Sequence, residues 1–187
     1  MMTIEIYIAT LAAGLIAGAY MLGMLVLSAI YPEKRTWPPE HATKAIKFRV
    51  WLMTILIFAA AFVLGALDWN RFEWPAAIRW GIGVPLIVLG NIAVWNGVFK
   101  IGMDATSGEA TGLKTDGLYR WSRNPQYVAD ITILLGWGVL TASLWALPVL
   151  AIGFAVLAVA PFAEEPWLEK VYGEDYRSYR LRVPRYI

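Results

Sequence analysis

Five long apolar runs, separated by short polar segments, set the pattern of the chain. They cover about residues 6–30, 50–67, 78–99, 127–142 and 143–162. A helix needs about 20 apolar residues to cross a hydrocarbon core of about 30 Å, so each run predicts a membrane-spanning helix. The last two runs are joined almost without a loop and predict a short helical hairpin. The pattern therefore predicts an all-α integral membrane protein with about five transmembrane helices.

The chain after the fifth run is amphipathic. Its apolar and aromatic positions recur at steps of three and four residues, as on one face of a helix: Leu168, Tyr172, Tyr176, Tyr179 and Val183. We expect a C-terminal amphipathic helix that Gly173 splits in two and that ends at Val183-Pro184. Such a helix either lies at the membrane interface or folds back as a lid over the polar residues beside it.

Composition and charge agree with a membrane location. Of the 187 residues, 59% are hydrophobic and 16% are charged, against about 25% charged residues in soluble domains. With the N-terminus outside, five spans place 14 of the 16 Lys and Arg residues on the cytoplasmic side. The positive-inside rule therefore predicts a multi-pass protein with an external N-terminus and a cytoplasmic C-terminus. These positive charges face anionic headgroups, so we expect no nucleic-acid partner.

The N-terminal half contains few candidates for chemistry. The chain has no cysteine and one histidine, His41, which excludes disulfides and thiolate clusters and gives no reason to expect a soft-metal or haem site. Residues 36–39, a Thr-Trp-Pro-Pro segment, predict either an interfacial anchor or a loop that faces a substrate. Asn91 and Asn96 interrupt the third apolar run, and we interpret them as contacts between helices rather than as ligands.

Polar residues gather directly before the fourth run, in residues 114–130. Backbone N–H groups at the start of a helix lack partners, and the helix dipole favours an anion there. Arg120 and Arg123 add planar guanidinium groups that suit a carboxylate or a phosphate. The segment is therefore a candidate anion site or, alternatively, a positive anchor at the cytoplasmic surface.

Three carboxylates lie close to this segment in the expected fold. Asp130 falls about one turn inside the fourth run, where a bare carboxylate is costly, so we expect it to pair with Arg120 or Arg123 or to hold a ligand. Glu164 and Glu165 follow the fifth run. Because a short hairpin brings its two cytoplasmic ends together, both acids are expected near Arg123. Charges of both signs at the rim of a helix bundle predict a site for an amphipathic, zwitterionic ligand.

The same residues resemble a family of membrane enzymes. Its pattern has a Gly-x-Tyr and an Arg-His-Pro-x-Tyr segment, a helical hairpin, a Glu-Glu pair and a closing segment with Gly, two Tyr and Val-Pro. The matching positions are Gly117, Tyr119, Arg123, Pro125, Tyr127, Glu164, Glu165, Gly173, Tyr176, Tyr179, Val183 and Pro184. From about residue 113 to the C-terminus, the chain is similar to the isoprenylcysteine carboxyl methyltransferase and phospholipid methyltransferase superfamily.

Two positions depart from that pattern. Asn124 stands where the family has a histidine, and Ala129 stands where it has a glycine. An amide donates and accepts hydrogen bonds as a neutral imidazole does, but it cannot carry a proton near neutral pH. A cofactor contact at Asn124 therefore survives the exchange better than a general-base role. Ala129 adds a methyl group where a ligand or a neighbouring helix approaches.

The resemblance implies one membrane domain with two roles. Residues 113–187 would bind S-adenosylmethionine, and residues 1–112 would form a transmembrane scaffold and the acceptor side. The acceptor would be a lipophilic molecule or a lipid that enters from the bilayer and carries a carboxylate, an amine or a thiol. An amine must lose a proton, which Glu164, Glu165 or Asp130 can accept.

The residues that the resemblance implies for the cofactor are Gly117, Tyr119, Arg120, Arg123, Asn124, Pro125, Tyr127, Val128, Glu164 and Glu165. Within this set, Glu164, Glu165, Arg123 and Asn124 are the candidate catalytic residues. Two other functions are compatible with the sequence. A membrane reductase of the sterol-reductase type would use a nicotinamide cofactor and usually has a longer chain. A non-catalytic lipid-binding or assembly protein would accommodate the exchange at Asn124.

Overall fold

The computed structural model describes residues 4–39, 43–106 and 112–187, and of residues 98–106 only the helical backbone. Every element in these ranges is helical: α1 (Ile4–Ile30), η1 (Pro32–Lys34), α2 (Lys44–Leu67), α3 (Ala76–Ile78), η2 (Arg79–Gly83), α4 (Val84–Thr106), η3 (Gly117–Arg120), α5 (Pro125–Thr141) and α6 (Leu147–Arg182). The all-α prediction is confirmed. His41 lies outside the described residues.

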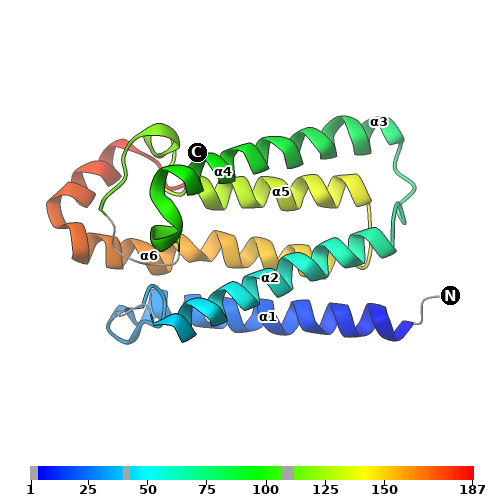
Figure 1. The fold of residues 1–187 in the computed structure, drawn as a ribbon, viewed down its shortest axis with the longest axis horizontal. Helices are drawn as coiled ribbons and strands as arrows, with labels where there is room; N and C mark the ends of the chain where they lie inside the picture. Colours follow the sequence, from blue (N-terminus) through cyan, green and yellow to red (C-terminus); the bar gives the residue numbers. More distant parts are fainter. Residues whose placement is uncertain (1–3, 40–42, 107–111) are drawn as a thin grey trace.

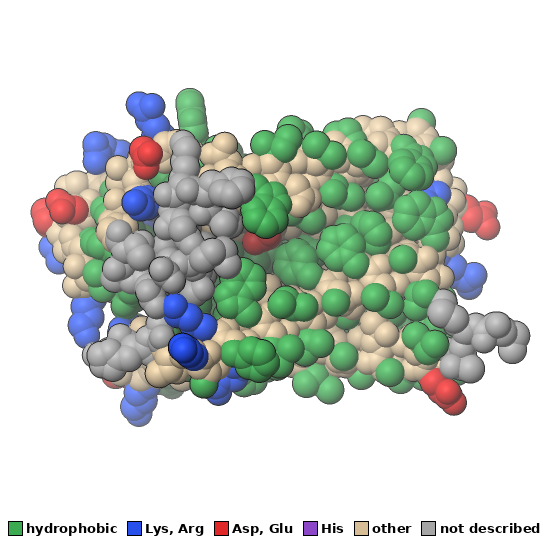
Figure 2. Space-filling view, viewed as in Figure 1, with side chains coloured by type: hydrophobic (Ala, Val, Ile, Leu, Met, Phe, Trp, Pro, Cys, Tyr) green, Lys and Arg blue, Asp and Glu red, His purple; other side chains and the backbone are tan. Residues whose placement is uncertain are grey.

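The long helices form one bundle with their axes roughly side by side (Figure 1). α1 packs on α2 and α6, α4 packs on α5, and α5 packs on α6. Figure 2 shows that Lys and Arg side chains gather at one end of the bundle, with few at the other. This basic end contains the end of α1, the starts of α2 and α5, and the C-terminus (Figure 1). The charge asymmetry agrees with the sequence, and the orientation in the membrane stays a prediction.

Four helical stretches are long and apolar enough to cross a membrane: Ile4–Ile30, Lys44–Leu67, Ala76–Gly97 and Leu147–Arg182. The fourth predicted span corresponds to α5, which is not among these four and has 17 residues, at the lower limit for a crossing helix. It forms with α6 the short hairpin that the sequence predicts. α6 has 36 residues but breaks at Gly173; its part before the break is about 39 Å long at 1.5 Å per residue, longer than a hydrocarbon core of about 30 Å.

The third predicted span is not a uniform α-helix. A π-helical turn, Arg79–Gly83, lies between α3 and α4 and is followed by Pro85. A proline ring crowds the carbonyl group one turn earlier, and a wider turn relieves that contact. Asn91 donates to the carbonyl oxygen of Ile87 in its own helix, at 2.9 Å. This bond of Asn91 stays within one helix, and the interpretation of Asn91 and Asn96 as contacts between helices stays a prediction.

Glycine lets α4 and α5 approach at backbone distance. A Cβ atom at Gly136 would lie 2.7 Å from the carbonyl oxygen of Gly83, and one at Gly90 would lie 2.8 Å from that of Ala129. Small residues permit such close pairs in membranes, where packing rather than the hydrophobic effect drives helix association. Ala129, at the family's glycine position, is 3% exposed and lies at this helix contact.

The end of α2 holds the turn between α5 and α6. Asp68 accepts hydrogen bonds from the Ser143 hydroxyl (2.9 Å) and from the backbone N–H groups of Leu144 (2.8 Å) and Trp145 (3.1 Å). Backbone donors at the start of a helix have no partner within the helix. One carboxylate therefore joins α2 to the hairpin at the end opposite the basic end.

The C-terminal part of α6 folds back at the basic end, toward the start of α5 (Figure 1). Gly173 breaks the helix as predicted, with a φ of 54°, a left-handed value that favours glycine. Beyond the break, Tyr176 and Tyr179 are 1% and 3% exposed and pack in a cluster that includes Leu113. The aromatic stripe thus faces the protein. Of the two alternatives for the C-terminal helix, the structure shows the one in which the helix folds back, and not the one in which it lies at the membrane interface.

Candidate functional site

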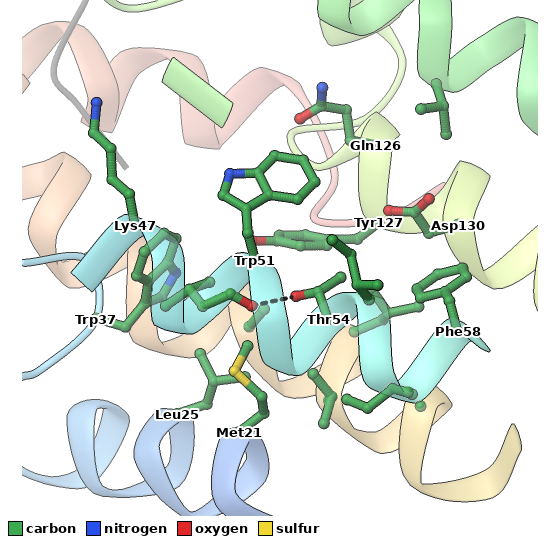
Figure 3. Close-up of a pocket in the computed structure, with 18 residues that line it drawn as sticks. Met21, Leu25, Trp37, Lys47, Trp51, Thr54, Phe58, Gln126, Tyr127 and Asp130 are labelled. Atoms are coloured by element: carbon green, nitrogen blue, oxygen red, sulfur yellow. Dashed lines mark hydrogen bonds between the residues drawn. The ribbon is translucent and has the colours of Figure 1, made fainter. Parts of the chain in front are cut away.

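A cavity of about 350 Å³ lies between α1, α2, α5 and α6, in the half of the bundle nearer the basic end (Figure 3). This volume is typical of small-ligand sites. Most lining side chains are apolar, among them Met21, Leu25 and Phe58, and the charged ones are Lys47 and Asp130. Figure 2 shows an acidic side chain at the bottom of a hollow in the surrounding apolar surface.

The cavity opens toward the membrane-facing surface between α2 and α4. Trp51 and Ile55 of α2 line it and are 37% and 56% exposed. Val94 of α4 lines its other side. The lining of the cavity therefore reaches the outer face of the bundle.

Glu164 lies beside this cavity, where two aromatic residues that line it donate hydrogen bonds to its carboxylate. The indole Nε1 of Trp37 donates to its Oε1 at 2.8 Å, and the hydroxyl of Tyr127 donates to the same oxygen. Trp37 and Tyr127 both line the cavity, and Trp37 is 7% exposed. Both hydrogen bonds reach Oε1 of Glu164, and no donor from the described part of the chain is bonded to its Oε2.

Trp37 decides between the two interpretations of residues 36–39. Its ring lines the cavity and its indole N–H is bonded inside the protein. The segment is therefore a loop that faces the cavity, and the interpretation as an interfacial anchor is wrong for Trp37.

Glu165 is the centre of a buried ion cluster. Its carboxylate accepts two hydrogen bonds from Arg185, each at 2.8 Å, and forms an ion pair with Nη1 of Arg123 at 3.1 Å. The exposed fractions of the Glu165, Arg123 and Arg185 side chains are 6%, 9% and 31%. The expectation that the acids after the fifth run meet Arg123 is confirmed for Glu165. Both oxygens of Glu165 are engaged by the protein itself.

Asn124 ties the C-terminal tail to the start of α5. Its side-chain Nδ2 donates to the carbonyl oxygen of Arg185 at 3.0 Å, and the Ser122 hydroxyl donates to the same oxygen at 3.3 Å. The backbone N–H of Arg123 donates to the carbonyl oxygen of Pro184 at 2.9 Å. Asn124 is 7% exposed. These contacts give Asn124 a positioning role, and its predicted catalytic role stays a prediction.

The other predicted residues lie near this contact between the C-terminal tail and the start of α5. Gly117, Tyr119 and Arg120 are in η3, and Arg120 is exposed. The backbone carbonyl of Tyr119 accepts a hydrogen bond from the Tyr179 hydroxyl at 2.6 Å. Burial, aided by the charge of Glu164, raises the pKa of Tyr119 well above its ordinary value, so its phenol stays neutral. Pro125 occupies the first turn of α5, where its missing N–H costs least.

Val128 lies one turn into α5, and its carbonyl oxygen accepts a hydrogen bond from the Thr132 hydroxyl at 2.7 Å. Asp130, two residues further on, lines the cavity. Among the residues that the structure describes, neither Arg120 nor Arg123 forms an ion pair with Asp130, because Arg123 is bound to Glu165. The expected pairing of Asp130 with an arginine is therefore not found.

One residue of this site has no sequence signal of its own. Arg185, next to the C-terminus, is one of several positive residues after the fifth apolar run. Its cation also stacks on the ring of Phe162, at 3.9 Å from the centroid. Only the fold of the tail brings Arg185 to Glu165, and no local pattern distinguishes it from its neighbours.

The described part of the chain is thus a bundle of helices, four of them long and apolar enough to cross a membrane, with a fixed carboxylate beside an apolar cavity. The sequence pattern of the phospholipid methyltransferase family matches residues 78–175, more than half of the chain. The protein therefore belongs to the phospholipid methyltransferase family.

Three relatives illustrate this likeness. The nickel-cobalt-cadmium resistance protein NccN of Alcaligenes xylosoxydans xylosoxydans is 23% identical over 138 residues, 73% of this chain and 62% of that protein. Protein-S-isoprenylcysteine O-methyltransferase B of Arabidopsis thaliana is 32% identical over 113 residues, 54% of this chain and 55% of that protein. The phosphatidylethanolamine N-methyltransferase of Aspergillus fumigatus is 28% identical over 156 residues, 74% of this chain and 16% of that protein.

Two of these relatives are methyltransferases by name, and one is named for metal resistance. The chain spans at most about three fifths of their lengths. No solved structure matches it significantly. Within the described ranges, no group of three or more His, Asp or Glu residues is placed to hold a metal ion.

Proposed function

We propose that this protein is an S-adenosylmethionine-dependent methyltransferase acting on a lipophilic or lipid acceptor from the bilayer. Membership in the phospholipid methyltransferase family supports methyl transfer. The observation that carries the proposal is the position of Glu164, a carboxylate held by Trp37 and Tyr127, which both line an apolar cavity. We also propose that the basic end of the bundle faces the cytoplasm, where the cofactor is found.

The residues around the cavity suit this cofactor chemically. S-adenosylmethionine, when bound, supplies an electrophilic methyl group on a sulfonium. Its hydroxyl and ammonium groups can donate to Oε2 of Glu164, and its carboxylate can accept from a guanidinium. Arg123 has a buried Nε without a hydrogen-bond partner, which provides one such donor. Glu165 has no free oxygen, so we assign it to holding Arg123 and Arg185 in place rather than to the cofactor.

The protein's own contribution is to align the reactants and to exclude water. Methyl transfer from a sulfonium is an in-line displacement whose charge disperses in the transition state, so it depends on orientation and desolvation more than on acid–base groups. Leu25, Phe58 and Trp51 provide apolar walls for an acceptor chain. Tyr127 and Trp37 fix the Glu164 carboxylate, so that little reorganisation is needed on binding.

Transfer of a labelled methyl group tests this proposal directly. The full chain, reconstituted in lipid nanodiscs, is incubated with S-adenosylmethionine carrying a labelled methyl group and with total membrane lipids. We expect label in the lipid fraction and at least about a tenfold loss in Glu164→Gln, because a hydrogen bond to a charged group contributes about 1.5–3 kcal/mol. Glu169→Gln, an exchange on the same helix that leaves the cavity intact, is the control. A folded protein that transfers no label would be a binder rather than an enzyme.

A further inference from the structure

Asp130 is an unusual side chain for its position. It lies five residues into α5, about 7.5 Å along the helix from its start, and it points toward the cavity beside Phe58 and Tyr127 (Figure 3). No hydrogen bond or ion pair joins its carboxylate to another described residue. An unpaired carboxylate at membrane depth is costly, and a cation bound in the cavity would compensate for it.

The aromatic part of the lining favours the same kind of ligand, and Lys47, the cation of the lining, is drawn at the opposite side of the cavity from Asp130 (Figure 3). Four aromatic side chains, Trp37, Trp51, Phe58 and Tyr127, share the cavity with Asp130 (Figure 3). The face of an aromatic ring attracts a cation by about 0.5–2 kcal/mol and repels an anion. A carboxylate acceptor would meet the like charge of Asp130 and the negative faces of these rings. An ammonium group would be stabilised by both.

We propose that Asp130 is the specificity-determining residue of the cavity and selects an amphiphile with an amine headgroup over one with a carboxylate. This inference rests on the proposed function only in calling the amphiphile a methyl acceptor. The carboxylate of Asp130 accepts one proton from the ammonium, which gives a carboxylic acid and a neutral amine. The lone pair of that amine is then free to act as the nucleophile.

Binding of two matched amphiphiles tests the inference without any methyl transfer. Dodecyltrimethylammonium, which cannot accept a methyl group, and dodecanoate are titrated by calorimetry into the full chain in nanodiscs without cofactor, with empty nanodiscs as the blank. We expect the protein to bind the cation at least about tenfold more tightly, a difference of about 1.4 kcal/mol. Asp130→Asn should abolish this preference, and Asp130→Glu, which retains the charge, should keep it.

Asp175→Asn is the matched control, because Asp175 is an exposed carboxylate on α6, beyond the break at Gly173. Asp130→Asn removes an unpaired charge, so it should fold with a thermal midpoint at or above that of the wild type. Equal binding of cation and anion by the wild type, or a preference that survives in Asp130→Asn, would overturn the inference. A defect of Asp130→Asn in S-adenosylmethionine binding alone, with the preference intact, would also overturn it. Because the probes need no cofactor, failure of the labelling assay would count against the proposed function only.

Discussion

Replacing Glu165 with glutamine removes the negative charge that binds two arginines where the C-terminal tail contacts the start of α5. Arg123 comes from the start of α5 and Arg185 from the tail, and both bind the Glu165 carboxylate at 2.8–3.1 Å. The side chains of Glu165 and Arg123 are more than nine-tenths buried. Without Glu165, two guanidinium groups face each other with no counter-charge. We therefore expect Glu165→Gln to destabilise the fold strongly.

The magnitude follows from burial. Removing one partner of a buried ion pair costs about 3–5 kcal/mol, and the partial exposure of Arg185 places Glu165→Gln near the lower end. For a chain of this length, each kcal/mol shifts the thermal midpoint by about 2–4 °C. We therefore expect a decrease of about 6–12 °C, measured by near-UV circular dichroism or tryptophan fluorescence of the purified protein in a mild detergent.

Glu169 provides a matched comparison. It also binds two arginines, Arg177 and Arg180, each at 3.0 Å, but the three side chains are 31–54% exposed. Solvent-exposed pairs contribute about 0.2–1 kcal/mol each, so losing both pairs in Glu169→Gln should cost about 0.4–2 kcal/mol and lower the midpoint less than Glu165→Gln does. If the two variants lose the same stability, burial of the Glu165 cluster does not decide its energy and the reasoning is refuted.

Three further exchanges can be measured in the same thermal assay. Asn124→Ala removes the side-chain donor to the C-terminal tail and should cost about 1 kcal/mol; an unchanged midpoint would mean that water replaces this bond at no cost. Gly136→Ala places a methyl group 2.7 Å from a carbonyl oxygen of η2 and should cost about 1–3 kcal/mol, whereas Gly81→Ala, with nothing within 4 Å, should cost nothing. Equal midpoints for these two would contradict the close packing of α4 and α5. Asp68→Ala removes the acceptor of three hydrogen bonds at the hairpin turn and should lower the free energy of unfolding by about 1–2 kcal/mol. A variant as stable as the wild type would show that these hydrogen bonds do not stabilise the turn.

The helices could be predicted from the sequence because their signals are local. Hydrophobic length marks the spans, and steps of three and four residues mark the stripe of Tyr176 and Tyr179. Gly173 and Val183 mark where that helix breaks and ends, as the structure has it. The π-helical turn was not predicted, because Pro85 lies within an otherwise uninterrupted apolar run and a membrane helix tolerates proline in several ways.

The candidate site could be predicted in part. Arg123 and Glu165 meet because the hairpin is short, which is a property of the sequence. The different partners of Glu164 and Glu165 were not predictable. Adjacent residues on a helix point in directions about 100° apart, and only the packed bundle decides which one meets Trp37 and Tyr127 and which one meets the arginines. The contact of Arg185 with Glu165 was not predictable either, because the path of the C-terminal tail depends on tertiary contacts.

Binding of S-adenosylmethionine to purified protein tests the central claim, that Glu164 beside the cavity holds the methyl donor. Calorimetric titration of the full chain in detergent should give a saturable isotherm, and Glu164→Gln should weaken the affinity by at least about tenfold, or about 1.4 kcal/mol. The control variant Glu169→Gln should bind S-adenosylmethionine with the affinity of the wild type. A wild-type protein that binds no S-adenosylmethionine, or a folded Glu164→Gln variant with unchanged affinity, would contradict the account.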